Sequence, residues 1–135
     1  MNSYRHVVRK WVKPADLNQH GALFGGRLME WVDEEAAIIA GVQLGTVSIV
    51  TRHMSAVDFV ARADRGDLLE LTYGVARFGR TSVTLSCVVE NVATAQVILT
   101  LAEIVFVAVD DSGLPVAHGF HTVATDSVRL RPAAT

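Results

Sequence analysis

Hydrophobic and polar residues alternate with a period of two over much of the second half of the chain. The alternation is clearest over residues 69–76, in which Leu69, Leu71, Tyr73 and Val75 are each followed by a polar or small residue. Such a period is typical of strands that bury one face. We predict strands over residues 46–55, 67–78, 81–91 and 95–110, and a first strand over residues 5–12.

Residues 25–41 show a different pattern, without proline and without alternation, and helix formers dominate it. We predict one long helix here. At about 100° per residue, its main apolar face consists of Leu28, Trp31, Val32, Ala36, Ile38 and Ile39. An adjoining face consists of Gly26, Met29, Asp33, Ala37 and Ala40.

One helix and four or five long strands predict a two-layer α+β domain, in which an antiparallel sheet wraps around the helix. The 135 residues suffice for a single domain, 1–135, with a core over about residues 5–117. Residues 121–135 are ambiguous. Residues 123–130 suit an edge strand, and residues 131–135 suit a frayed tail.

Composition narrows the range of partners and compartments. Half of the residues are apolar and 19% are charged, which favours a surface partly covered by self-association. The net charge of -2 disfavours nucleic acid as a partner. No stretch suits a membrane span or a secretory signal. Cys87 is the single cysteine, so we expect a small core residue in a cytoplasmic protein.

Asp33 is the residue whose position carries most information about chemistry. It follows Gly26 by almost two helical turns, so its carboxylate projects from the same side as the amides at the helix start. Those amides lack intrahelical acceptors and can hold a carbonyl oxygen that becomes negative during acyl transfer. A carboxylate there serves as a general base on water or as a nucleophile. The competing interpretation is a solvated helix face that carries four acids.

Several segments, taken in order, resemble hotdog-fold acyl-CoA thioesterases. Residues 16–26 and 28–34 resemble the family's glycine-rich turn and central helix. Later segments are similar to its strands, namely residues 49–51, 57–59, 66–70, 77–82 and 106–110. The resemblance covers about residues 5–117 and implies hydrolysis of an acyl-CoA thioester to a free acid and coenzyme A.

The same resemblance implies roles for individual residues. The family's acidic catalytic residue falls on Asp33, and Gly26 supplies an amide that holds the oxyanion. In these enzymes the pocket lies between subunits, so Asn18 or His20 of one chain is expected near Asp33 of its mate. This implies a dimer, or a tetramer or hexamer built from dimers.

Coenzyme A requires partners for its phosphates and amides. Arg77, Arg80, Thr81 and Ser82 form one basic, hydroxyl-bearing turn, and Arg62 belongs to another. The planar guanidinium group of arginine matches phosphate oxygens. The 79–82 segment also matches the family. We expect no other cofactor, and the scattered histidines predict no metal site.

Two other functions stay open at this point. A hotdog dehydratase or hydratase uses a histidine and a carboxylate, and His20 precedes Glu34 at a compatible interval. The Asp16, Asn18 and His20 loop also resembles the loop of hydratases, although its spacing differs and the expected proline is absent. A non-catalytic acyl-CoA-binding module is the third possibility, and the presence of Asp33 argues against it.

Overall fold

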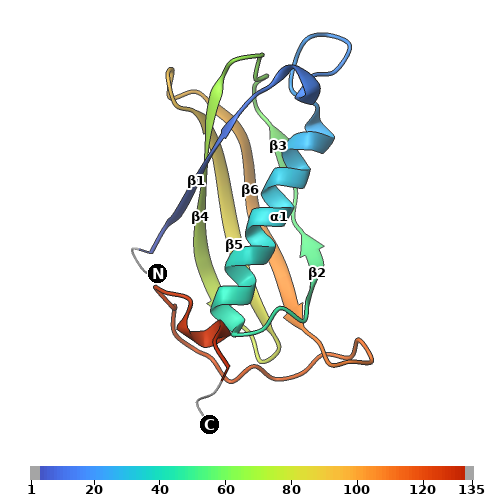
Figure 1. Cartoon of the computed structure of the whole chain (residues 1–135), viewed down its shortest axis with the longest axis vertical. Helices are drawn as coiled ribbons and strands as arrows, with labels where there is room; N and C mark the ends of the chain where they lie inside the picture. Colours follow the sequence, from blue (N-terminus) through green and yellow to red (C-terminus); the bar gives the residue numbers. More distant parts are fainter. Residues whose placement is uncertain (1–3, 133–135) are drawn as a thin grey trace.

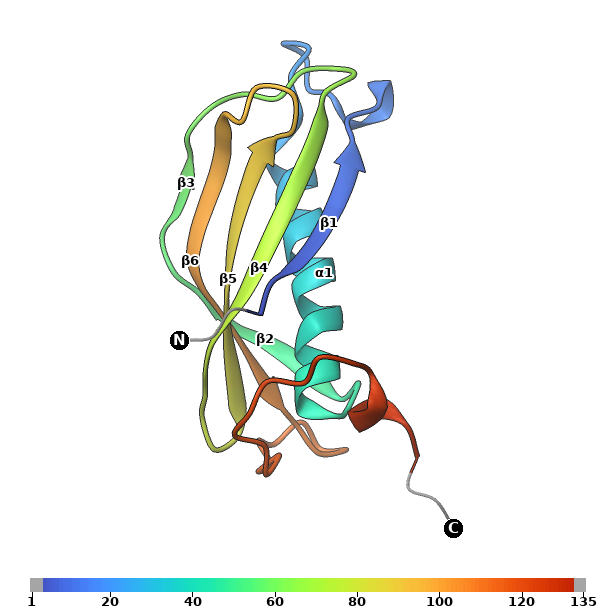
Figure 2. The ribbon, with the colours of Figure 1, turned by 90° about the vertical axis from the view of Figure 1, so that its left-hand side faces the viewer.

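A curved antiparallel sheet wraps one face around a long helix in the computed structural model, which describes residues 4–132 (Figures 1 and 2). Within these residues the strands lie in the order β1-β4-β5-β6-β2, and β3 pairs with β6 further along. The strands are β1 (His6–Trp11), β2 (Ile49–Met54), β3 (Val57–Phe59), β4 (Leu68–Phe78), β5 (Ser82–Asn91) and β6 (Val97–Ala108). The predicted two-layer α+β architecture is confirmed.

Helix α1 (Gly25–Leu44) begins where the sequence predicts and extends three residues further, to a left-handed cap at Gly45. Its buried residues include Leu28, Val32, Ala36 and Ile39, as predicted. Ile38 was wrongly placed on this face, because its side chain is 53% exposed. At about 100° per residue it lies at the margin of the apolar stripe, outside the reach of the sheet.

The predicted strand over residues 46–55 is two strands in the structure. Ser55 stands in the break between β2 and β3, where its amide donates to the Glu103 carbonyl and its hydroxyl accepts the Glu103 amide. Ladder pairing with β6 then resumes at Val57. β2 itself has a register irregularity between Thr51 and His53. The break bends this edge of the sheet away from a single straight strand.

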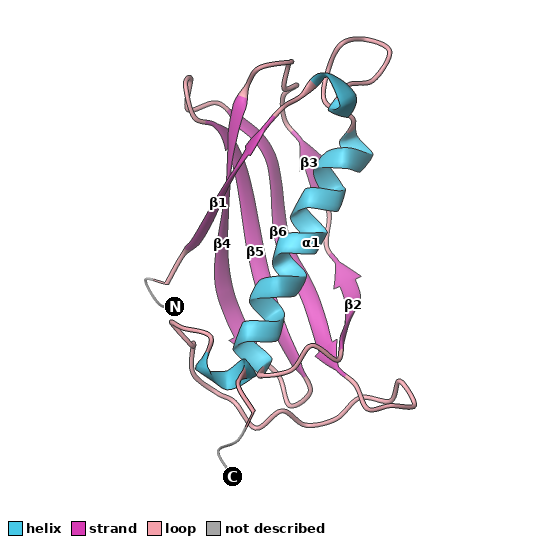
Figure 3. Ribbon diagram, viewed as in Figure 1, coloured by secondary structure: helices cyan, strands magenta, loops and turns pink. Residues whose placement is uncertain are grey.

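The C-terminal segment forms no edge strand, which corrects the interpretation of residues 123–130. It is a loop that ends in a short 3-10 helix, η2 (Val128–Leu130), beside the end of α1 (Figure 3). The backbone of this segment is hydrogen-bonded by the buried side chain of Gln43 and not by a neighbouring strand. This side chain donates to the Ala124 carbonyl at 2.8 Å and accepts the Ala124 amide at 2.7 Å. The last residues of the predicted tail, 133–135, lie outside the described residues.

Cys87 lies in the core on β5, as predicted for a small apolar residue, and is 1% exposed. Beside it Tyr73 is equally buried, and its hydroxyl donates to the Val32 carbonyl of α1 at 2.9 Å. Burial raises the pKa of the Cys87 thiol to about 12, because the apolar surroundings disfavour a thiolate. The same cause raises the pKa of Tyr73.

We therefore expect Cys87 to resist a thiol reagent such as DTNB at pH 8 in the folded protein and to react fully in guanidinium chloride. Because its folded pKa is raised, the stability it contributes is complete below about pH 9 and is lost as the pH rises toward about 12. Absorbance of the released thiolate measures the labelling, and a Cys87→Ser variant gives the background. Stoichiometric labelling of the folded protein within the mixing time contradicts this burial.

Candidate active site

The loop before α1 is held together by Asn18. Its side-chain oxygen accepts the amides of His20 at 2.8 Å and Ala22 at 3.2 Å, in the manner of an Asx turn. Gly21 supplies the positive φ of 77° that the turn requires. Among residues 4–132 the Asn18 Nδ2 makes no hydrogen bond, so this group remains available to a ligand or a second chain.

The start of α1 is open to an incoming group. Phe24 is its N-cap residue and provides no side-chain hydrogen bond. In the described part of the chain, the amides of Gly25 and Gly26 have no acceptor. A side chain at Gly25 would meet the Phe59 ring at 3.2 Å, whereas a Cβ at Gly26 would meet no atom within 4 Å. The Gly26 amide is therefore an accessible donor at the positive end of the helix dipole.

Asp33 lies in the middle of α1 and is half-buried. Its Oδ1 accepts a hydrogen bond of 3.0 Å from the hydroxyl of Thr51 on β2. This contact across the two layers distinguishes Asp33 from its exposed neighbours Glu30 and Glu34. The fourth acid, Glu35, is bonded to His6 at 2.7 Å. The carboxylate of Asp33 therefore belongs to an organised pair at the edge of the sheet.

The sequence does not single out Thr51, whose hydroxyl binds Asp33. Thr51 belongs to residues 49–51, a strand segment that resembles the family, and a threonine in a strand is common for reasons of packing alone. The position of Thr51 next to Asp33 becomes apparent only when β2 is placed beside α1. Thr51 pairs with Phe106 of β6, whose buried side chain faces the helix, so the hydroxyl of Thr51 projects toward Asp33.

The 79–82 turn lies far from the start of α1. It joins β4 to β5 at the end of the molecule where α1 terminates, opposite Gly26 (Figure 1). The Ser82 hydroxyl lies so close to Gly79 that an added Cβ there would be 2.3 Å away. Arg80 and Thr81 engage other segments through their backbone carbonyls, and the Arg80 side chain is exposed. One chain does not bring this turn to Gly26.

Two further predicted arginines are engaged in ion pairs. Arg77 bonds Glu103 of β6 at 2.9 Å, and Arg62 bonds Asp64 at 2.7 Å. Arg62 also donates to the His20 carbonyl at 3.4 Å. Arg62 and His20 are thus brought together near the start of α1, whereas Arg77 belongs to the other end of the sheet.

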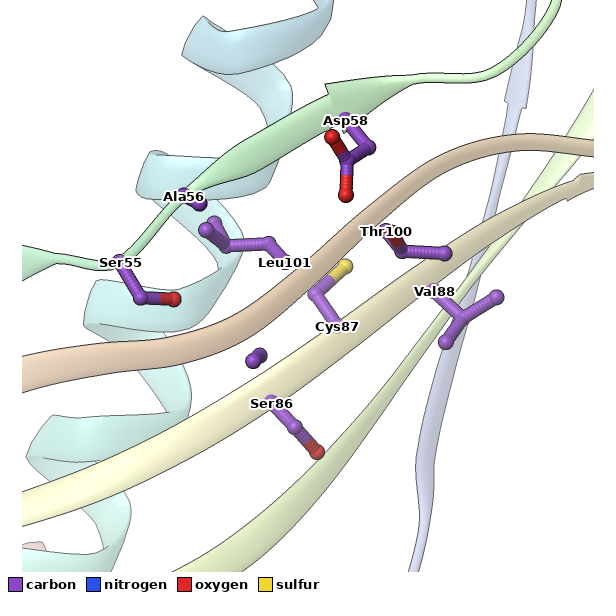
Figure 4. Close-up of a pocket in the computed structure, with 9 residues that line it drawn as sticks. Ser55, Ala56, Asp58, Ser86, Cys87, Val88, Thr100 and Leu101 are labelled. Atoms are coloured by element: carbon purple, nitrogen blue, oxygen red, sulfur yellow. The ribbon is translucent and has the colours of Figure 1, made fainter.

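A hollow of about 320 Å³ lies on the face of the sheet that is turned away from α1 (Figure 4). Ser86, Val88 and Thr100 line it, and they alternate with core residues such as Cys87. Asp58 of β3 also lines it, so this carboxylate is separated from Asp33 by the sheet. In residues 4–132 no group of three or more His, Cys, Asp or Glu side chains is arranged to hold a metal ion. Over the same residues, no helix is both long and apolar enough to span a bilayer.

Comparison with known sequences assigns the family. The family model described as the thioesterase superfamily matches residues 20–98. The protein named uncharacterized acyl-CoA thioester hydrolase YkhA of Bacillus subtilis is 34% identical over 78% of this chain and 62% of its own length. Acyl-CoA thioester hydrolase YciA of Escherichia coli is 32% identical over 81% of this chain and 86% of its own length. The chain thus spans less than two thirds of the Bacillus protein and most of the Escherichia protein.

Solved structures agree with this assignment. An acyl-CoA hydrolase from Staphylococcus aureus, in complex with butyryl coenzyme A and coenzyme A, has a TM-score of 0.68 at 32% identity and covers 84% of this chain and 68% of its own. A hexameric thioesterase from Yersinia pestis has a TM-score of 0.74 at 28% identity, over 82% of this chain and 91% of its own. The chain belongs to the thioesterase superfamily and has its hotdog fold.

Proposed function

We propose that this protein hydrolyses an acyl-CoA thioester to a free acid and coenzyme A. The observation that carries the proposal is the Asp33 carboxylate, held by Thr51 at 3.0 Å on the helix whose open start is at Gly26. The names of the Bacillus and Escherichia relatives support this substrate class. So does the coenzyme A bound to the Staphylococcus enzyme.

Asp33 acts in this proposal as a general base on water. It lies seven positions after Gly26, a rise of about 10 Å along the helix. The side chain of Asp33 leans toward the start of the helix, so the carboxylate, its bound water and the Gly26 amide can act on one carbonyl group. Direct attack by the carboxylate on the carbonyl carbon is the alternative mechanism.

The steps follow from these roles. The water oxygen bonds to the carbonyl carbon while its proton passes to Asp33, and the tetrahedral oxyanion is held by the Gly26 amide. The carbon–sulfur bond then breaks, and the coenzyme A sulfur leaves and takes up a proton, which restores the carboxylate. The Thr51 hydroxyl occupies one carboxylate oxygen and so directs the other toward the water.

Self-association is part of the proposal. β2 is an edge strand of the sheet. Exposed apolar side chains lie on α1, on the segment that leads into β2 and on β2 itself, namely Ile38 at 53%, Val47 at 86% and Val50 at 44%. Exposed edges and apolar patches of this kind are normally covered. The hexameric relative from Yersinia supports an assembly built from such contacts.

A second chain also supplies the remaining predicted residues. We propose that Asn18 or His20 of one chain faces Asp33 of the other. If it is Asn18, the contact is made by its Nδ2 group, which makes no hydrogen bond within residues 4–132. The Staphylococcus enzyme has been solved with an asparagine, an aspartate or a threonine replaced by alanine. The replaced asparagine and aspartate are separated by the same number of residues as Asn18 and Asp33.

Because one chain does not bring the 79–82 turn to Gly26, we propose that the second chain holds the phosphates of coenzyme A with its exposed Arg80 and with Thr81 and Ser82. Arg77 and Arg62 are already paired with carboxylates, so they contribute only if a phosphate displaces those partners. No other cofactor enters the proposed reaction. We expect it to occur in the cytoplasm, since a single buried thiol suits a reducing compartment.

The test is release of free thiol from acetyl-, butyryl-, octanoyl-, palmitoyl- and benzoyl-CoA by the purified protein, followed with a chromogenic disulfide reagent. We expect hydrolysis of at least one substrate well above buffer controls. Crotonyl-CoA separates the alternatives, because a hydratase removes its double-bond absorbance without releasing thiol. Binding of these thioesters with neither change indicates the non-catalytic module instead.

A further inference from the structure

An apolar groove of about 350 Å³ lies between the second half of α1 and the segment that leads into β2. Every residue that lines it is apolar. The lining residues are Ala37, Ile38 and Gly41 of α1, Val47 and Ile49 on the β2 side, and Leu130 of η2. A groove of this size and character suits a hydrocarbon chain that carries no polar group.

The groove begins about one helical turn beyond the Asp33–Thr51 pair, and neither of these two residues lines it. Ala37 lies one helical turn beyond Asp33, and Gly41 lies one turn beyond Ala37. On the opposite wall, Ile49 precedes Thr51 by two residues in the same strand, so both side chains lie on one face. The two elements that hold the proposed reaction centre therefore also form the two walls of the groove.

We propose that this groove binds the acyl chain of the substrate and that Leu130 closes its far end, which makes the enzyme selective for medium-length acyl groups. This inference rests on the proposed thioesterase function. From Asp33 to Gly41 the helix rises about 12 Å, which corresponds to about ten bonds of an extended chain. Acyl groups of about eight to ten carbons fill that length.

Leu130 is 36% exposed, and its position at the end of the groove is fixed by contacts of its neighbour Arg129. The guanidinium group of Arg129 donates to the Gln43 carbonyl at 2.9 Å and lies 4.2 Å from the centre of the Phe120 ring. The backbone of Arg129 also approaches Gly45 so closely that a Cβ there would lie 2.8 Å from its carbonyl oxygen. This segment lies outside residues 20–98, which the family model matches. The stop is thus built from the chain's own C-terminal segment.

A second copy of the chain is the other candidate occupant, because Ile38 and Val47 are exposed. Proximity to Asp33 favours the acyl chain. A partner packed along β2 then forms a roof over the groove. The two occupants predict different effects of Leu130, since an acyl stop changes the substrate profile and an interface residue changes the oligomeric mass.

The experiment compares kcat/KM for acyl-CoAs of 4 to 16 carbons in the wild type, Leu130→Ala and Val128→Ala. The wild type is expected to peak at eight to ten carbons. Leu130→Ala is expected to raise the ratio of activity on 14 carbons to that on 8 carbons about tenfold, because the added apolar space is equivalent to several methylene groups. Val128 belongs to the same 3-10 helix but does not line the groove, so Val128→Ala is expected to leave the ratio unchanged.

A second variant blocks the groove from the other end. Ala37→Leu is expected to lower activity on chains of eight or more carbons at least tenfold while butyryl-CoA is still hydrolysed. The inference is overturned if Leu130→Ala scales every chain length equally, matches Val128→Ala, or alters the oligomeric mass without altering the profile. If the wild type hydrolyses no thioester, the proposed function fails. The role of the groove is then tested by calorimetry with the same acyl-CoAs. Their affinities should depend on acyl length and on Leu130 in the same way.

Discussion

Replacement of Asp33 by asparagine is expected to lower kcat about 10²- to 10⁴-fold, the range that general-base catalysis contributes. Asparagine preserves the shape of the side chain and still accepts a hydrogen bond from Thr51, but it cannot take a proton from water. Affinity for coenzyme A, measured by calorimetry, is expected to change little. Thiol release at saturating acyl-CoA measures the loss.

Two neighbouring changes make this result specific. Glu34→Gln removes an exposed charge from the next position of α1 and should leave kcat near that of the wild type. Thr51→Val removes the hydroxyl that binds Asp33 and should lower kcat about tenfold to a hundredfold. Thr51→Ser keeps a hydroxyl and should retain activity. If the Asp33→Asn variant keeps full turnover, the carboxylate does not act as the general base.

Replacement of Gly26 by proline is expected to lower kcat about 10²- to 10³-fold, as the loss of one oxyanion donor does. Proline deletes a single amide, and the first turn of a helix tolerates it because that amide has no intrahelical acceptor. Gly26→Ala is the matched control, since it keeps the amide and its Cβ would meet no atom within 4 Å.

The two variants are compared by thiol release and by thermal unfolding. A proline variant that unfolds at the temperature of the alanine variant and still loses activity supports the role of the amide in holding the oxyanion. Equal activity in the two folded variants excludes that role. A rise in KM with kcat unchanged also contradicts this role, because the amide is proposed to act on the transition state.

The fold could be predicted from sequence because its signals are local. The alternation around Leu69 and Tyr73 needs only neighbouring residues to be recognised, as does the unbroken helix from Gly25. Asp33 could be proposed as a site residue for the same reason, since its relation to Gly26 lies within one element. Ile38 was misplaced because a helix projection shows which residues share a face but not how wide a stripe the sheet covers.

Features that depend on distant residues could not be predicted. Thr51 meets Asp33 only after β2 folds onto α1, and a strand threonine has no distinguishing neighbours. Glu103 lies 26 residues beyond Arg77 in the sequence, so their ion pair was not foreseen from a hairpin that looked free to bind phosphate. The sequence of residues 123–130 is compatible with an edge strand, and it does not reveal that Gln43 binds the backbone of this segment.

Gln43 makes the end of the chain an integral part of the hotdog domain. Its amide is fully buried and is satisfied by Ala124, 81 residues away. Removing residues beyond about 118 would delete both hydrogen-bond partners of this amide together with the segment that covers it, and is expected to destabilise the domain by about 1 kcal/mol or more. The stability of the domain therefore depends on residues beyond the segment that the superfamily model matches, and a C-terminal fusion needs a spacer that leaves η2 packed against the helix.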